Sequence, residues 1–227
     1  MVPRAIRPYI IVLFLEGVMD KKRFIFDMDR TLVTCSYRRE ADYFKSIFGE
    51  RSQDFVPFIG KYLDDYENRY LFYEQEMLSL YLRDKSGLPF TPSIIQGWIE
   101  SGTLEKDEIS KGTFELLSYL RDHGKSLVVS TNWFGEAQKV RLKKCGLLEY
   151  FDDIYSGDQC LKPHRQAYKR AIGGYIPKEC VFIGDDIYKD YIGPRLYGLD
   201  SILFDPEEKH PNTFTKVKSM NELKERY

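Results

Sequence analysis

The stretch Phe24-Ile25-Phe26-Asp27-Met28-Asp29-Arg30-Thr31 decides how the rest of the chain is interpreted. Its first three residues are apolar, and the next five bring two carboxylates and a hydroxyl. A short apolar run that ends in charge is typical of a parallel strand buried on both faces, which here delivers Asp27 to its carboxyl end. The stretch therefore predicts a parallel sheet with acidic groups at one edge.

Three further polar segments follow later in the chain. They are Ser130-Thr131-Asn132, Lys162-Pro163 and Gly184-Asp185-Asp186, with Asp190 close behind the last one. The first and third follow the apolar runs 126–129 and 181–183, which are predicted strands. Loops after adjacent parallel strands converge on one crevice at the carboxyl edge of a sheet. We therefore expect these segments and the stretch 27–31 to form one site.

Strand and helix patterns alternate along most of the chain. The expected strands cover 24–26, 126–129, 154–155, 181–183 and 202–204, and the expected helices cover 114–121, 136–144, 163–172 and 188–197. Such alternation is typical of proteins in which helices cover both faces of a parallel sheet. The predicted fold class is therefore α/β, a doubly wound parallel sheet of the Rossmann type.

A long helical insertion interrupts this alternation. The segment 37–105 has a helical pattern, in which large apolar side chains recur at Tyr70, Tyr73, Met77, Leu80 and Tyr81. Thr91 and Pro92 match an N-cap followed by proline at the first helical position, and Gly102 closes that helix. We expect an inserted helical cap domain at 34–109 and an α/β core formed by 19–33 and 110–227. Packing, rather than substrate contact, is the expected role of Tyr62, Tyr66, Tyr70, Phe72 and Trp98.

Composition limits the class of partner. The chain has 227 residues, of which 43% are hydrophobic, and this is enough for a packed core. Lys plus Arg (34) nearly balance Asp plus Glu (35), so no overall field draws the protein to nucleic acid or to an anionic membrane. We expect no nucleic-acid or membrane partner, and a small soluble substrate.

Cysteine spacing and the first 18 residues bear on the compartment. The four cysteines, Cys35, Cys145, Cys160 and Cys180, are scattered and indicate neither a zinc site nor a disulfide framework. Since free thiols fit a reducing compartment, we expect a cytoplasmic protein. The apolar stretch within 1–18 is too short to span a bilayer, and it lacks a clear small-residue cleavage site. We interpret 1–18 as an extension or an additional strand before an alternative start at Met19, in preference to an export signal.

The acidic segments carry the groups that phosphoryl transfer needs, which are an in-line nucleophile, a proton donor for the leaving oxygen and a metal. Asp27, fixed at a strand end, is the predicted nucleophile and would form an aspartyl-phosphate. Asp29, two residues on, can reach the leaving oxygen and is the predicted acid and then base. Lys162 supplies a fixed cation for the phosphate. Thr131 and Asn132 offer a hydroxyl, an amide and backbone N–H groups to the same phosphate.

A divalent ion is expected beside these groups. Mg²⁺ prefers hard oxygen ligands in an octahedron, which Asp27, the backbone carbonyl of Asp29 and Asp185 would supply together with water and substrate. Asp190 is expected to orient these ligands from a second layer. Because the segment 184–186 leaves the register open, Asp186 is an alternative ligand or second-layer residue.

Taken together, these residues resemble the haloacid dehalogenase superfamily, in its phosphatase branch with a helical cap between the first and second motifs. The first motif, aspartate-x-aspartate-x-threonine, is Asp27 to Thr31, and the later motifs match Thr131, Lys162 and Asp185 with Asp190. The resemblance extends from residue 21 over almost all of the remaining chain. It implies a Mg²⁺-dependent hydrolase that acts on a small phosphorylated metabolite.

Two departures from the family pattern stand out. Arg30 stands where glycine is usual, and His164-Arg165 replaces the commoner Asp-Pro. Neither departure removes a group that the chemistry needs, and Asp29 distinguishes the chain from the dehalogenase branch, which has no acid at this position. The stretch Tyr37-Arg38-Arg39 enters the cap above the site, where it meets either an acidic substrate or solvent.

Other interpretations stay open at this point. Each motif alone is common in turns, helix caps and surfaces, and only their ordered occurrence indicates a site. A phospho-accepting receiver domain uses similar groups, but it is about half as long and lacks an inserted cap. A phosphomutase or phosphotransferase would use the same nucleophile. A catalytically silent binding module of the same fold is the remaining alternative.

Overall fold

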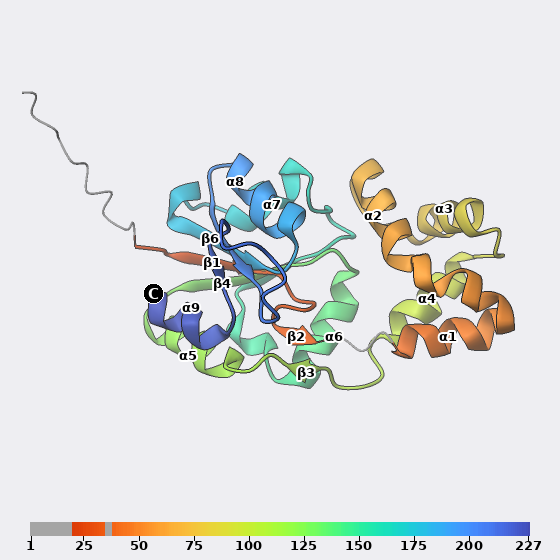
Figure 1. The fold of residues 1–227 in the computed structure, drawn as a ribbon, viewed down its shortest axis with the longest axis horizontal. Coiled ribbons are helices and arrows are strands. Elements are labelled where there is room, and N and C mark those ends of the chain that lie inside the picture. Colours follow the sequence, from red (N-terminus) through yellow and green to blue (C-terminus); the bar gives the residue numbers. More distant parts are fainter. Residues whose placement is uncertain (1–19, 35–37) are drawn as a thin grey trace, which may run out of the picture.

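The computed structural model describes residues 20–34 and 38–227 (Figure 1). Our expectations for residues 1–18, for Cys35 and Tyr37 and for the side chain of Arg38 lie outside the described part. Within it, an α/β core carries an all-helical segment at one end, on the right of Figure 1.

Six parallel strands form the central sheet of the core, in the order β5-β4-β1-β6-β7-β8. Their bounds are β1 Arg23–Phe26, β4 Ser126–Ser130, β5 Asp153–Tyr155, β6 Cys180–Gly184, β7 Asp200–Phe204 and β8 Lys216–Val217. In the middle of the sheet, Phe24 of β1 is aligned with Leu127 of β4 on one side and with Val181 of β6 on the other. All four residues of β1 are buried, as a strand covered on both faces must be.

Helices cover both faces of this sheet, and the predicted doubly wound α/β class is confirmed. One face packs against α5 (Thr113–Asp122), α6 (Gly135–Cys145) and α9 (Met220–Arg226). The other face packs against α7 (Arg165–Ile172), with α8 (Gly193–Leu196) on the same side (Figure 1). Since side chains alternate along a strand, Phe24 and Phe26 enter the first layer and Ile25 enters the second.

The core differs from the sequence prediction in three places. The expected helix 188–197 is a π-helical segment, Ile187–Ile192, followed by the single turn of α8. Helix α7 begins at Arg165 rather than at Pro163. Strand β8 and helix α9 were not predicted, although the side chain of Ser219 caps α9 by accepting from the backbone N–H of Glu222.

The insertion leaves and re-enters the core through a short antiparallel pair, β2 (Val33–Thr34) and β3 (Glu108–Ile109). Between them lie α1 (Arg38–Phe48), α2 (Ile59–Arg69), α3 (Gln75–Ser86) and α4 (Pro92–Ser101), with 3₁₀ turns at Gly49–Asp54 and Val56–Phe58. The predicted cap of α4 is confirmed, because the side chain of Thr91 accepts from the backbone N–H of Ile94 at 3.3 Å. No described helix, here or in the core, combines the length and the apolar character that crossing a membrane requires.

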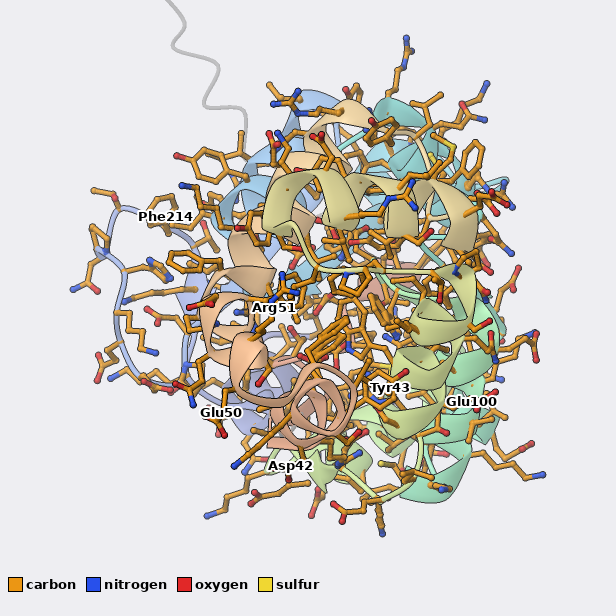
Figure 2. All side chains as sticks on the ribbon, turned by 90° about the vertical axis from the view of Figure 1, so that its right-hand side faces the viewer. Asp42, Tyr43, Glu50, Arg51, Glu100 and Phe214 are labelled. Atoms are coloured by element: carbon orange, nitrogen blue, oxygen red, sulfur yellow. The ribbon has the colours of Figure 1, made fainter. Side chains whose placement is uncertain are left out.

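An aromatic cluster holds the four helices of the insertion together. Phe44 lies within ring-centroid distances of 5.1 Å of Phe55, 5.1 Å of Trp98 and 5.8 Å of Phe90. Figure 2 views this part of the molecule end-on and shows Tyr43 between the helices. Tyr66 and Trp98 are fully buried, as expected for packing residues, whereas Phe72 is exposed and contradicts that expectation.

The helical spacing predicted from Tyr70 onward is wrong in its phase. The chain is not helical from Tyr70 to Glu74, and α3 begins only at Gln75, where the side chain of Glu74 caps it. Met77 and Leu80 consequently face solvent. The buried face of α3 is formed by Leu78, Ser79, Tyr81 and Leu82.

Candidate active site

Three strand ends place polar residues at the same edge of the sheet. Asp27 directly follows β1, Thr131 follows β4, and Asp185 follows β6. Because β1 pairs with both β4 and β6, the three loops are neighbours. A cavity of about 340 Å³ lies between these loops and the helical insertion. Its walls include Asp27, Lys162 and Asp185 from the core and Glu40, Leu63 and Trp98 from the insertion.

Lys162 joins two of the carboxylates at this edge. Its Nζ donates to Asp27 Oδ1 at 2.8 Å and to Asp190 Oδ1 at 2.7 Å, and its side chain is 2% exposed. Burial alone would lower the pKa of the Lys162 ammonium group, but the charges of Asp190 and Asp27 raise this pKa overall. Lys162 is therefore a permanently charged, fixed group beside Asp27, which is what recognition of a phosphate dianion needs.

Asp27, Asp185 and Asp190 bring carboxylate oxygens within 4.8 Å of one another. Burial raises the pKa of Asp185 and of Asp190, and the nearby charge of Asp27 raises both further. Such crowding of like charges is relieved when a cation binds among them. Three hard oxygen donors and no described sulfur or imidazole ligand in the group are a set that suits Mg²⁺.

The close approach of Asp190 depends on a glycine. A Cβ atom on Gly184, at the end of β6, would lie 2.5 Å from Cγ of Asp190, so only glycine fits there. Asp186 has a different place. Its Oδ1 accepts from two backbone N–H groups of the following turn, at 2.8 and 2.9 Å, and so caps the π-helical segment. The structure thus brings Asp190 into the carboxylate group and places Asp186 outside it.

Asp29 lies on the wall of the same cavity but turns toward α6. Its Oδ1 accepts from Nη2 of Arg141 at 2.6 Å, and its Oδ2 accepts from Nε2 of Gln138 at 3.0 Å. Its side chain remains 30% exposed, whereas that of Arg141 is 7% exposed. The carboxylate is therefore held from the side of α6, and part of its surface remains exposed at the cavity wall.

Thr131 and Asn132 play different parts. Thr131 lines the cavity, and its Oγ1 accepts from Nε2 of Gln138 at 2.8 Å. The side chain of Asn132 spans the backbone of Lys162, because its Nδ2 donates to the carbonyl at 2.7 Å and its Oδ1 accepts from the N–H at 2.8 Å. Asn132 therefore fixes the loop that carries Lys162, and Thr131 presents a hydroxyl to the cavity.

Arg30, which replaces the usual glycine, has a strained backbone conformation. Its φ is +63°, in the left-handed region that favours glycine and that costs other residues about 1 kcal/mol or more. Its Nε pairs with Asp185 Oδ2 at 2.8 Å. The side chain thus adds a positive charge at the carboxylate edge, where a glycine would add none.

Lys189 and His164 connect the core to α2 and to the residue that follows it. Lys189 Nζ pairs with Glu67 Oε2 at 2.6 Å and with Asp64 Oδ1 at 2.7 Å. His164 Nε2 lies 2.9 Å from the carbonyl oxygen of Glu67 and 2.8 Å from that of Tyr70. Since carbonyl oxygens only accept, this nitrogen carries the proton. The second departure from the family pattern therefore contacts the insertion rather than the carboxylates.

Sequence reasoning missed four residues that shape the site: Asp107, Gln138, Arg141 and Lys189. A signal existed for two of them, because Gln138 and Arg141 stand three residues apart within a predicted helix that follows Thr131. Nothing in the sequence indicated that this polar pair would be buried. Asp107 and Lys189 carried no recognisable pattern.

Relatives with curated names match part of the chain. A ribulose-1,5-bisphosphate 5-phosphatase from Halopiger xanaduensis is 26% identical over 149 residues, which cover 64% of this chain and 61% of that protein. The pyrimidine 5′-nucleotidase PynA from Streptococcus pneumoniae is 26% identical over 114 residues, or 48% of each protein. Both matches span less than two thirds of the relative's own length.

A solved structure and a family model match more of the chain. The magnesium-bound crystal structure of the HAD-hydrolase YfnB from Bacillus subtilis superposes with a TM-score of 0.72 at 20% identity, covering 91% of this chain and 98% of that one. This likeness establishes the fold. The model for haloacid dehalogenase-like hydrolases matches residues 21–198, a range that includes every site residue described above. The chain therefore belongs to the haloacid dehalogenase-like hydrolase family.

Proposed function

We propose that this protein is a Mg²⁺-dependent phosphatase that hydrolyses small phosphate monoesters through an aspartyl-phosphate on Asp27. The observation that carries the proposal is the buried contact of Lys162 with Asp27 and Asp190, beside the oxygens of Asp185. This arrangement combines a nucleophile, a fixed cation and a set of oxygen ligands in one small space. The names of the two curated relatives, a phosphatase and a nucleotidase, agree with it.

In the first step, Asp27 attacks phosphorus. Because Lys162 holds Oδ1 of Asp27, we assign the attack to Oδ2. The bond from phosphorus to the ester oxygen breaks, and Asp29 donates a proton to that oxygen so that a neutral alcohol leaves. Lys162 and the hydroxyl of Thr131 balance the charge of the transferring phosphoryl group.

In the second step, water attacks phosphorus while Asp29 accepts a proton from it, and the bond to Asp27 breaks to release inorganic phosphate. Asp27, Asp185 and Asp190 would hold Mg²⁺, which when bound neutralises phosphate charge and helps to align the nucleophile. Lys162 stays paired with the carboxylates throughout, so no unpaired buried charge is left when phosphate departs.

We further assign 34–109 to a cap domain that closes the site and 110–227, with 19–33, to the catalytic core. Residues of α1, α2 and α4 contribute to the cavity wall, so the alcohol part of the substrate would contact this cap. The size of the cavity, about 340 Å³, suits a small phosphorylated metabolite. Free thiols at Cys145, Cys160 and Cys180 agree with a cytoplasmic location.

The test replaces the nucleophile. With Mg²⁺ present, the natural sequence should release inorganic phosphate from 4-nitrophenyl phosphate, and Asp27→Asn should lower turnover by about 10³-fold or more, because an amide does not attack phosphorus. Asp42→Asn, on the exposed surface of α1 (Figure 2), is the matched control and should leave turnover unchanged.

The same assay separates the alternatives. Turnover that survives in a folded Asp27→Asn variant would refute the assigned nucleophile. Phosphate found on an added alcohol instead of in solution would identify a phosphotransferase. A natural protein that binds inorganic phosphate with Mg²⁺ but turns over none of a panel of metabolite phosphates would be the silent binding module.

A further inference from the structure

Gln138 and Arg141 form a buried polar pair on α6, and Arg141 lines the cavity. Gln138 is fully buried, and the side chain of Arg141 is 7% exposed. Buried groups of this kind usually need a full set of hydrogen-bond partners, and their removal is costly. The hydrogen-bond partners of Gln138 and Arg141 therefore indicate the role of the pair.

The guanidinium of Arg141 is fixed by three different residues. Nε donates to Asp107 Oδ2 at 2.8 Å, Nη1 donates to Gln138 Oε1 at 2.7 Å, and Nη2 donates to Asp29 Oδ1 at 2.6 Å. A planar fork with each of its three nitrogens engaged has little freedom to turn. The contact with Asp29 is thus made by a group whose position is already determined.

The amide of Gln138 connects two groups of the proposed site. Its Oε1 accepts from Arg141, which fixes the orientation of the amide, so that Nε2 is the atom that faces Asp29 and Thr131. Nε2 then donates both to Asp29 Oδ2 at 3.0 Å and to Thr131 Oγ1 at 2.8 Å. Because this bond uses an acceptor site of the Thr131 hydroxyl, the hydroxyl proton is left to be donated toward the cavity.

Asp107 anchors the pair to the point where the chain returns from the insertion. Its side chain is 1% exposed, and its Oδ1 accepts from Nη2 of Arg39 at 3.1 Å. Arg39, at the start of α1, also donates to the carbonyl of Gly102 at 3.0 Å. Both segments that connect the insertion to the core therefore end in the same buried network that reaches Asp29.

We propose that Gln138 and Arg141 are positioning residues of the phosphatase reaction. Arg141 fixes the carboxylate of Asp29 for proton transfer to the leaving oxygen, and Gln138 aims the Thr131 hydroxyl at the phosphate. The inference rests on the proposed function, because it assigns the pair to the acid and to the phosphate-binding hydroxyl of that mechanism.

A leaving-group comparison tests the role of Arg141. Phenyl phosphate needs its leaving oxygen protonated, whereas 2,4-dinitrophenyl phosphate releases a stable anion. In single-turnover experiments, which report only release of the phenol, Arg141→Gln should slow phenyl phosphate about 10- to 100-fold and change 2,4-dinitrophenyl phosphate less than about threefold. In an Asp29→Asn background the same substitution should add no further loss, because it acts through Asp29.

Two further variants complete the test. Gln138→Met should weaken inhibition by inorganic phosphate more than Arg141→Gln does, because Arg141 reaches Thr131 only through the Gln138 amide. Arg121→Gln breaks the partly exposed ion pair with Asp152 and is the control for removal of an arginine from the core. If Arg141→Gln does not fold by circular dichroism, Arg141→Lys is measured in its place, because it keeps the charge but loses the planar fork.

The outcomes separate this inference from the proposed function. An equal loss on both esters, a faster reaction, or a loss that adds fully to that of Asp29→Asn would overturn the positioning role of Arg141. Unchanged phosphate inhibition in Gln138→Met would overturn the role of Gln138. In each case a natural protein that is active and an Asp27→Asn variant that is inactive would leave the proposed function standing.

Discussion

The core and the helical insertion, which we assign to a cap, place their side chains by different physical rules. In the core, sheet hydrogen bonds continue beyond the strands and fix the residues that follow them. The N–H of Asp27 donates to the carbonyl of Ile183 at 2.8 Å, and the N–H of Thr131 donates to that of Tyr155 at 2.9 Å. In the cap, the described residues form helices and turns that are positioned by aromatic packing around Phe44.

This difference predicts how substitutions act in each region. A site residue of the core sits on a backbone that neighbouring strands hold, so its side chain can be changed with little movement elsewhere. A cap residue belongs to a packed cluster in which position depends on the volume of every neighbour. Substitutions at the core edge should therefore change the chemical step, and substitutions in the cap should change stability first.

The largest expected effect on the core side, after loss of the nucleophile, is that of Asp29→Asn. An amide in place of the carboxyl group removes the acid and base while keeping a similar shape, so kcat on phenyl phosphate should fall about 10²- to 10⁴-fold. KM should stay within about threefold, because the phosphate contacts that we propose for Lys162 and Thr131 do not involve the exchanged oxygen. Steady-state kinetics with Mg²⁺ present measures both parameters.

Retained turnover in Asp29→Asn would remove the acid and base role from this residue. The free energy of unfolding should be measured alongside, because the variant also weakens the ion pair with Arg141. A fall in activity that merely follows a loss of folded protein would place Asp29 with the structural residues. That result would contradict the expectation that substitutions at the core edge change the chemical step before they change stability.

Much of the core could be predicted because its pattern is local. The strands β1, β4 and β6 are short, mostly apolar runs, and Asp27, Thr131 and Asp185 each stand directly after one of them. Parallel topology then brings the loops together without further information. The position of Asp190 was harder to predict, because it depends on a π-helical segment and on the space left by Gly184.

The cap and the polar support of the site were less predictable for a physical reason. Aromatic residues at helical spacing do not show where a helix starts, so the break from Tyr70 to Glu74 was missed and the solvent-facing Met77 was assigned to the apolar face. Burial of Arg141 depends on Asp107, which lies 34 residues earlier in the chain. Contacts between residues so far apart in the chain produce no periodic pattern in the sequence.

Neighbouring residues of α3 give a matched test of the corrected cap. Leu78 is fully buried, whereas Met77 is 39% exposed. Leu78→Ala should lower the free energy of unfolding by about 2–5 kcal/mol, because it leaves a cavity in the cluster. Met77→Ala should change it by no more than about 0.5 kcal/mol. Urea denaturation followed by tryptophan fluorescence measures both.

The opposite result, with Met77→Ala the more damaging change, would restore the helical phase that the sequence predicted. Activity sharpens the test further. At a temperature where both variants are folded, kcat on phenyl phosphate should stay within about threefold of the natural protein, because neither side chain touches the reacting groups. A large fall in kcat for folded Leu78→Ala would show that cap packing controls the chemical step.

Substitutions of two glycines in the cap helices should have smaller effects than Leu78→Ala, and these effects should have opposite signs. A Cβ on Gly97 of α4 would lie 2.9 Å from Cζ of Tyr43 and would overlap its hydroxyl. That ring is held in place, because its hydroxyl donates to the carbonyl of Ile94 at 2.8 Å, in the space between α1 and α4 (Figure 2). Gly97→Ala should therefore cost about 1–3 kcal/mol through overpacking.

Gly60 of α2 is the matched control, because nothing lies within 4 Å of a Cβ built on it. Alanine loses less backbone entropy on folding than glycine, so Gly60→Ala should raise the free energy of unfolding by about 0.5 kcal/mol. Urea midpoints that move in opposite directions would show that contact between α1 and α4, and not helix propensity, limits the cap. A stabilising Gly97→Ala would instead mean that Tyr43 can leave its place, and that the cap is less tightly packed than the core it covers.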